Sequence, residues 1–414
     1  MSRNPVNSMS RILSRQNILT LYLPTLTLSL GQGIAVPALP VYARSFDVSF
    51  GIASTVLVAF AIGGLIAGVP TGYLIDRFGR RKVIIAGPIL IAGSSFLAAF
   101  AQSFPELLAY RFVAGVGQQM WNIARTTMVA ETGADRERGR QMSTIMALQN
   151  LGMILGPAVG GLVAALWGVR IPFIFYGVLA LISTLPSSLQ APEAAEPRRG
   201  QPGASEEQPS WGWLRSTPIF LFFLGLFFAG ISRGALFSGT LNVYAVYAYG
   251  VGPETIGFMA GAAGAIGIPI TLLAGTVMDR YGRKASIIPG FTLITLALGI
   301  MVATAAFGWP FPVFVAIFLI VQGALTVTSG NLQVLGSDLA PAAARGRFFG
   351  VWQTVNQMGS VLSPSGFALL AETAGAPAGF AYLALASFLV VVLIGWFVPD
   401  PVGRKRAVAE AAQA

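Results

Sequence analysis

Three arginines inside apolar stretches are the residues of this sequence best placed to do chemistry. Arg111, Arg125 and Arg233 each lie in a stretch that is otherwise mostly hydrophobic. A charge at the centre of a membrane costs at least about 2.5 kcal/mol, so each arginine is expected to face a partner or a water-filled space. The chain has no cysteine and no histidine, which excludes disulfides, thiolate chemistry, the usual zinc, copper and haem ligand sets, and histidine-based catalysis. We therefore expect neither an enzyme nor a bound metal or cofactor.

Polar side chains at helical spacing accompany these arginines. Arg111, Gln118 and Asn122 fall on one face of a predicted helix, and three other apolar stretches carry comparable faces. A single polar residue in a membrane helix more often bonds a neighbouring helix, but the coincidence of such faces favours a substrate cavity. The candidate cavity residues are Gln32, Arg111, Gln118, Asn122, Arg233, Tyr244, Gln322, Trp352, Asn356 and Gln357.

Acidic residues are missing from the centre of every apolar stretch. All 16 Asp and Glu residues map to loops or helix ends, with Glu106 and Glu254 near one mouth. The charge within the membrane is therefore positive, which favours neutral or anionic amphipathic substrates. Protonation of Glu106 or Asp76 remains an alternative way to involve protons.

Helices must position these residues, because the chain is too apolar for a soluble protein. Hydrophobic residues make up 55% of it and charged residues 10%, and the mean hydropathy is +0.71. A helix crosses a bilayer with about 20 apolar residues. Runs of this kind lie near 18–43, 51–75, 83–103, 105–128, 141–167, 171–190, 218–248, 254–278, 286–308, 311–335, 347–371 and 376–398. The predicted fold class is an all-α integral membrane protein with twelve transmembrane helices.

Basic residues predict how these helices are oriented. The formal net charge is +10, yet the Lys and Arg residues gather in alternate loops, such as 77–82 and 136–140, and near both termini. This pattern is typical of cytoplasmic loops, so we predict a multi-pass protein of the plasma membrane with both termini cytoplasmic, and no nucleic-acid partner. No GxxxxGK[ST] loop occurs, so ion gradients rather than ATP hydrolysis would drive any transport.

The two halves of the sequence share landmarks in the same order. GYLIDRFGRRK at 72–82 recurs as GTVMDRYGRK at 275–284, and Pro157 matches Pro364. Such a repeat predicts two pseudo-symmetric six-helix bundles. The predicted division is an N-terminal bundle at 1–190, a cytoplasmic linker at 191–216, a C-terminal bundle at 217–399 and a cytoplasmic tail at 400–414.

The repeated loop motif resembles the signature of the major facilitator superfamily, and the resemblance covers essentially the whole chain. It implies the fold of that transporter family and a cytoplasmic gate in these loops. A carboxylate near a helix N-terminus gains from the helix dipole, and the arginines can pair with acids such as Glu131. The alternative is that the arginines only set topology. The expected gating residues are Gly72, Asp76, Arg77, Gly79, Arg80, Glu131, Arg138, Asp279, Arg280, Gly282, Arg283, Asp338 and Arg345.

Small residues recur one turn apart in the fifth predicted helix, within GMILGPAVGG. Glycines at this spacing allow close helix packing, and the expected partner is the eighth helix, which carries Gly257 and Gly261. The stretch resembles the antiporter motif of exporters in the family, and LGQGIAVPALP at 30–40 resembles their first-helix motif. Ordinary packing is the alternative. The motif residues are Gly152, Gly156, Pro157, Gly160 and Gly161.

These features together imply a secondary active transporter that works by alternating access. The resemblance is to drug:proton antiporters, so the expectation is proton-coupled efflux of a small amphipathic drug or metabolite. An uptake permease for a sugar or organic anion, and a lipid flippase, stay open as alternatives. A sensor that does not transport is disfavoured, because the linker and tail are too short for an added domain. The expected partners are the substrate, protons and the lipid bilayer, and the protein is expected to be a monomer.

Overall fold

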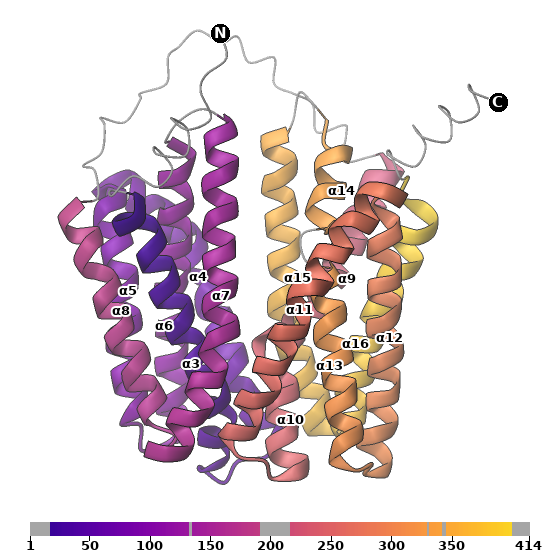
Figure 1. The fold of residues 1–414 in the computed structure, drawn as a ribbon, viewed down its shortest axis with the longest axis horizontal. Helices are drawn as coiled ribbons and strands as arrows, with labels where there is room; N and C mark the ends of the chain where they lie inside the picture. The colour runs from indigo at the N-terminus through magenta and orange to yellow at the C-terminus, as the bar shows by residue number, and fades with distance from the viewer. Residues whose placement is uncertain (1–16, 132–134, 191–215, 329–330, 342–344, 400–414) are drawn as a thin grey trace, which may run out of the picture. The chain divides into compact units, whose positions relative to one another are not determined.

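The computed structural model describes residues 17–131, 135–190, 216–328, 331–341 and 345–399. All regular secondary structure in these residues is helical (Figure 1), which confirms the predicted fold class at this level. In chain order the helices are η1 Ile18–Tyr22, α3 Leu23–Arg44, α4 Phe50–Phe78, α5 Arg80–Ala99, α6 Phe104–Glu131, α7 Asp135–Trp167, α8 Ile171–Gln190, α9 Thr217–Ser238, α10 Thr240–Tyr249, α11 Pro253–Tyr281, α12 Lys284–Phe307, α13 Phe311–Thr328, α14 Asn331–Leu339, α15 Arg345–Ala374, α16 Ala376–Val392 and η4 Leu393–Phe397.

Nine helices in the described part of the chain are long and apolar enough to cross a membrane. They are Ile18–Arg44, Phe50–Phe78, Arg80–Ala99, Thr144–Trp167, Thr217–Ser238, Pro253–Met278, Lys284–Phe307, Phe311–Leu339 and Ala376–Phe397. The described side chains of α8 cover Ile171–Leu185, which is also apolar, and polar side chains interrupt α6 and α15. The chain is thus a multi-pass membrane protein, while the count of twelve helices and the side on which the termini lie stay predictions.

The chain forms two compact units. The first unit contains α3, α5, α6, α7 and α8, most of α4, and the segment Ala245–Gly261. Within this unit α3 packs against α7 and α8, and α5 packs against α6 and α8. These helices run from indigo to magenta in Figure 1.

The second unit repeats this packing. It contains α9, α12 to α16, the remaining parts of α10 and α11, and the segment Ser49–Thr55. Here α9 packs against α15 and α16, and α12 packs against α13 and α16. With α9 and α10 counted as one helix, and α13 and α14 as another, these are the same ordinal pairs as in the first unit, which supports the predicted duplication. The boundaries 1–190 and 217–399 stay predictions, and 191–215 and 400–414 lie outside the described residues.

Glycines bring α3 and α7 into backbone contact in the first unit. A Cβ atom added at Gly33 would lie 3.0 Å from the Gly156 Cα, and one added at Gly160 would lie 2.0 Å from the Ile34 carbonyl oxygen. Buried Pro157 lies at the same contact, with its Cδ 3.1 Å from the Cβ position of Gly33. No side chain fits at Gly160 unless one of the two helices shifts.

The structure corrects the expected partner of this glycine motif. Gly152, Gly156 and Gly160 face α3, whereas Gly161 alone among the motif glycines faces α11, where an added Cβ would lie 2.9 Å from the Gly257 Cα. The spacing of small residues defines a face of a helix but not the helix that lies opposite, because several helices in this chain offer such faces. The second unit joins α9 and α15 in the same way: a Cβ at Gly230 would lie 3.0 Å from the Gly359 Cα.

The stretch 218–248, predicted as one helix, is two helices. Between α9 and α10, Gly239 adopts a left-handed conformation with a φ of +103°, and its N–H donates to the Ala235 carbonyl. Glycine takes this conformation without the steric cost of a Cβ atom, which is why it so often ends a helix. The continuous apolar run conceals this break in the sequence.

Candidate functional site

A half-buried arginine, Arg111, marks the polar face of α6 in the first unit. The Arg111 guanidinium carbon lies 4.7 Å from the centroid of the Phe60 ring on α4. Its Nε is buried and has no hydrogen-bond partner among the described residues. The ionisable group that interacts with Arg111 is the phenol of Tyr176 on α8, and no described carboxylate lies close enough to do so. Arg111 is therefore a half-buried cation that lies against the Phe60 ring and has no acidic partner among the described residues.

Three polar side chains continue this face along α6. Tyr176 donates from its hydroxyl to Gln118 Oε1 at 3.4 Å, and Gln118 Nε2 lies 3.4 Å from Asn122 Oδ1. Farther along the helix, Arg125 Nη1 lies 3.4 Å from the Thr25 hydroxyl oxygen on α3. These bonds are long, which leaves the polar groups able to exchange partners.

The structure brings together part of the predicted set in this unit. Arg111, Gln118 and Asn122 share one face as predicted, and Gln32 is half-buried on α3. Phe60 and Tyr176 were missed by the sequence analysis. Tyr176 carried a usable signal, because a phenol within an apolar helix needs a hydrogen-bond partner.

The second unit holds the other candidates. The Arg233 guanidinium carbon lies 5.1 Å from the Phe237 ring centroid on the same helix. The indole nitrogen of Trp352 is buried without a hydrogen-bond partner in the described part of the chain. Three further candidates are half-buried, on α13 and α15: Gln322, Asn356 and Gln357.

Tyr244, another candidate of the second unit, is buried among aromatic rings. It is 6% exposed, and its ring centroid lies 5.0 Å from that of Phe380 and 5.7 Å from that of Phe314. Helical spacing placed Tyr244 on the face of Arg233, but most of a tyrosine ring is apolar and packs well among aromatic side chains. Its ring thus packs among aromatic side chains, and its assignment to the cavity stays a prediction.

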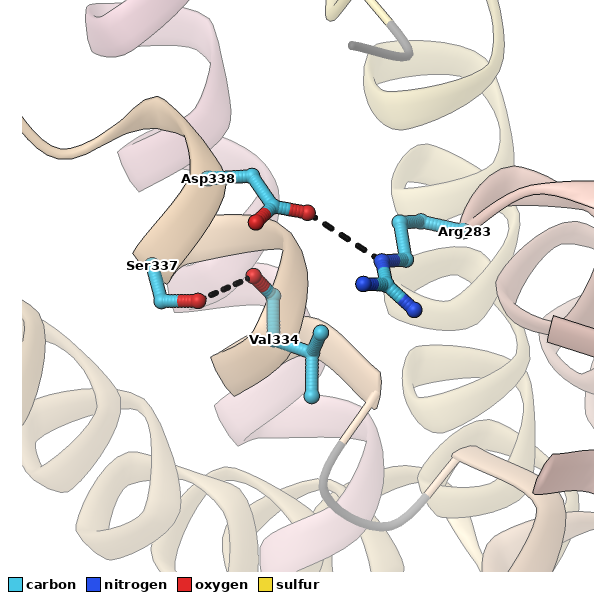
Figure 2. Close-up of polar contacts among 4 residues, drawn as sticks. All are labelled: Arg283, Val334, Ser337 and Asp338. Carbon is cyan, nitrogen blue, oxygen red and sulfur yellow. Dashed lines mark hydrogen bonds and ion pairs between the residues drawn. The ribbon is translucent and has the colours of Figure 1, made fainter. Parts of the chain in front are cut away.

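The loop motif of the second unit forms an ion pair. Arg283 Nε lies 3.1 Å from Asp338 Oδ2, and Ser337 beside it donates to the Val334 carbonyl at 2.7 Å (Figure 2). Gly282 precedes Arg283 with a φ of +102°, and Gly79, its counterpart in the first unit, has a φ of +81°. The motif glycines thus allow the left-handed turn that starts α12 and α5.

For the remaining residues of the loop motifs, the structure shows single contacts or only their exposure. Asp76 is exposed at the end of α4, and Arg77 donates to the Tyr73 hydroxyl at 3.2 Å. Arg280 lies 5.4 Å from the Tyr281 ring centroid, Arg80 is half-buried at the start of α5, and Gly72 lies within α4. The side chains of Glu131, Arg138, Asp279 and Arg345 lie outside the described part of the structure, so the pairing expected at Glu131 stays a prediction.

Two described acids at helix ends accept hydrogen bonds from neighbouring groups. Glu106 accepts hydrogen bonds from the Gln102 backbone N–H and the Ser103 hydroxyl, both at 3.0 Å. Glu372 on α15 accepts a hydrogen bond from the Ser49 hydroxyl. These carboxylates thus bond groups just before α6 and α4, and neither is recorded as a partner of the half-buried arginines.

Comparison with known proteins places these features in a family. Residues 21–364 and 222–414 match the family model described as Major Facilitator Superfamily. Multidrug resistance protein 2 of Bacillus subtilis (strain 168) is 26% identical over 347 residues, which cover 81% of this chain and 84% of that protein. Quinolone resistance protein NorA of Staphylococcus aureus (strain MRSA252) is 29% identical over 172 residues, covering 42% of this chain and 44% of that protein.

Solved structures share the fold. A D-xylose-proton symporter superposes with a TM-score of 0.74 at 18% identity, over 97% of this chain and 99% of that chain. The human organic anion transporter MFSD10 (TETRAN) superposes with a TM-score of 0.65 at 19% identity, over 95% of this chain and 100% of that chain. At these identities the likeness concerns the fold alone. The resemblance first seen in the loop motifs is confirmed, and the chain belongs to the major facilitator superfamily of membrane transporters.

Proposed function

We propose that this transporter is a proton-coupled exporter of small amphipathic drugs or metabolites. The observation that carries the proposal is the similarity to Multidrug resistance protein 2, which extends over 81% of the chain. The similarity to the quinolone resistance protein supports the same direction of transport. The protein would work by alternating access as a twelve-helix monomer in the plasma membrane, with both termini cytoplasmic.

The candidate binding groups fit such a substrate. The polar face of α6, with Arg111 and Gln118, lies beside the aromatic side chains of Phe60 on α4 and Tyr176 on α8. A polar face of this kind would fix the head group of an amphipathic molecule, and apolar side chains would bind the rest. The proton would be carried by a carboxylate at a helix end, such as Asp76, because the apolar stretches contain no central acid or histidine.

Reconstitution in proteoliposomes tests direction and coupling together. A panel of amphipathic dyes and drugs is loaded, a pH gradient of either sign is imposed, and the flux of each compound is followed. The proposal expects at least one compound to move against its own gradient, opposite to the proton flux, and not when the pH gradient is collapsed. A flux of the compound that is the same with and without the pH gradient would contradict proton coupling.

Intact cells distinguish export from uptake. Cells that express the protein should accumulate less of a transported dye than cells that carry an empty vector. Greater accumulation would instead favour an uptake permease for a sugar or organic anion. Movement of a fluorescent phospholipid between leaflets, without movement of any dye, would favour a flippase.

A further inference from the structure

We propose that the Ser363 hydroxyl forms a hinge in α9, at which this helix bends and straightens during transport. Ser363 lies on α15 and is fully buried. The inference goes beyond the proposed function, because it concerns a change of shape that does not depend on which compound is carried. It uses only contacts within the second unit.

The Ser363 hydroxyl bonds two backbone groups of α9 at once. It accepts a hydrogen bond from the Ala235 N–H at 2.6 Å and donates one to the Ile231 carbonyl. In an uninterrupted α-helix these two groups bond each other, since each N–H donates to the carbonyl four positions earlier. A side chain that enters this series of backbone bonds is a known cause of helix bending. The contact therefore marks a point at which α9 can bend.

The helix that supplies the hydroxyl is interrupted beside the same point. Pro364 follows Ser363 in α15 and has no N–H to donate to the Ser360 carbonyl. That carbonyl lies against α9, since a Cβ atom added at Gly234 would lie 2.6 Å from its oxygen. The backbone bonds of both helices are thus interrupted where the helices touch, so α9 can bend there without losing its contact with α15.

The hinge leaves a short part of α9 able to move. Before the hinge, α9 packs closely on α15, because a Cβ added at Gly230 would lie 3.0 Å from the Gly359 Cα. After the hinge, residues 236–238 are all that remain of the helix before Gly239 ends it in a left-handed conformation. Arg233 lies between the two bonded residues, so bending would change the direction of its side chain as well.

The matching position of the first unit carries no hydroxyl. Pro157 matches Pro364 in the repeat, so Gly156 stands where the second unit has Ser363. The backbone of Gly156 meets α3 directly, and a Cβ added there would lie 2.6 Å from the Gly33 Cα. Both units share the close glycine contact, and Ser363 adds to it, in the second unit, a group that enters the backbone of the opposite helix.

Removing this hydroxyl should leave a complete helix. In Ser363→Ala the Ala235 N–H and the Ile231 carbonyl can bond each other, so neither buried group is left without a partner. The variant is therefore expected to unfold at the wild-type temperature and to keep α9 straight. Because the bent form is lost, we expect the flux of a transported compound in proteoliposomes to fall severalfold.

Ser387→Ala is the matched control for this variant. Ser387 on α16 is fully buried as well, and its hydroxyl bonds the Ser232 hydroxyl on α9 at 2.5 Å. This bond joins two side chains and involves no backbone group of α9. Ser387→Ala therefore removes a buried hydroxyl beside α9 without closing the hinge, and it should retain the wild-type flux.

Spin labels measure the bend directly. The chain contains no cysteine, so two introduced cysteines are the only sites for a thiol-reactive label. Ser238→Cys reports on the short part of α9, Phe220→Cys reports on its beginning, and each is paired with Phe307→Cys at the exposed end of α12. Double electron–electron resonance gives both distances in the full-length protein. We expect Ser363→Ala to shift the 238–307 distance and to leave the 220–307 distance unchanged, and Ser387→Ala to change neither.

Each result bears on the proposal. Loss of flux together with a shift of the 238–307 distance alone, both specific to Ser363→Ala, supports it. Wild-type flux or a wild-type 238–307 distance in Ser363→Ala overturns it. An equal loss of flux in Ser387→Ala, or a shift of both distances, would point to a general effect of the lost hydroxyl and overturns it as well. The distances need no substrate, so absence of flux for every compound would refute the proposed export function, and the distances would still decide whether the hinge exists.

Discussion

Arg283 Nε lies 3.1 Å from Asp338 Oδ2, and this ion pair joins the residue that precedes α12 to α14 in the second unit (Figure 2). The two side chains are 20% and 30% exposed. Pairs with this exposure typically contribute about 0–1 kcal/mol to stability. The pair is therefore better suited to bias one conformation than to hold the fold together.

Breaking this ion pair should impair transport more than stability. Asp338→Asn is expected to lower the transport rate severalfold while changing the free energy of unfolding by less than about 1 kcal/mol. The measurements are proteoliposome flux and thermal unfolding. Ser337→Ala is the control, since its hydroxyl donates only to the Val334 carbonyl in the structure. The reversed pair, Arg283→Asp with Asp338→Arg, should recover part of the flux, and no recovery at all would argue against a role for the pair itself.

Neutralising Asp76 should abolish transport and leave the protein folded. Asp76 is exposed at the end of α4, so the change to Asn removes no buried contact. Flux and size-exclusion profile are compared with those of the wild type, and Asp47→Asn, in the loop before α4, serves as the control. Full activity in Asp76→Asn would remove its assignment to the gate.

The sequence predicted which segments form helices, but it did not predict which helices pack against each other. Apolar runs locate the helices because lipid requires every backbone group to be bonded within its own segment. The same apolar pattern continues through Gly239 and gave no sign that its left-handed conformation divides the stretch 218–248 into two helices. Glycine spacing identified the face of α7 but not α3 as its partner, because the opposite helix is set by tertiary packing.

The candidate site was predicted to a similar extent. Helical spacing correctly placed Arg111, Gln118 and Asn122 on one face, since all three belong to one helix. Spacing could not find Phe60 or Tyr176, which reach this face from other helices. Spacing also could not reveal that the Tyr244 ring packs among aromatic side chains, which come from other helices.

A methyl group at the helix seam should destabilise the first unit. In Gly160→Ala the new Cβ would lie 2.0 Å from the Ile34 carbonyl oxygen, and overpacking of this kind costs about 1–3 kcal/mol. A lower unfolding temperature in detergent is the expected result. Gly93→Ala is the matched control, since its added Cβ meets no described atom within 4 Å. An unfolding temperature equal to that of Gly93→Ala would show that the seam is looser than the structure indicates.

Removing Arg233 should narrow the range of substrates. Arg233 lies against the Phe237 ring on α9, where it adds positive charge to the second unit. Arg233→Ala is expected to reduce flux of anionic compounds selectively, because neutral compounds gain nothing from that charge. Flux is measured for matched anionic and neutral compounds, with Arg170→Ala as the control. Unchanged selectivity would separate Arg233 from substrate choice.

The glycine contact between α3 and α7 has a mechanical consequence. Two helices that meet largely through backbone atoms have few long side chains at the seam that could change rotamer and absorb sliding. A displacement applied to one end of α7 should reach α3 almost undiminished, as it would through a stiff lever. The Gly230 and Gly359 contact gives α9 and α15 the same stiffness. We therefore expect the two helices of each pair to tilt together.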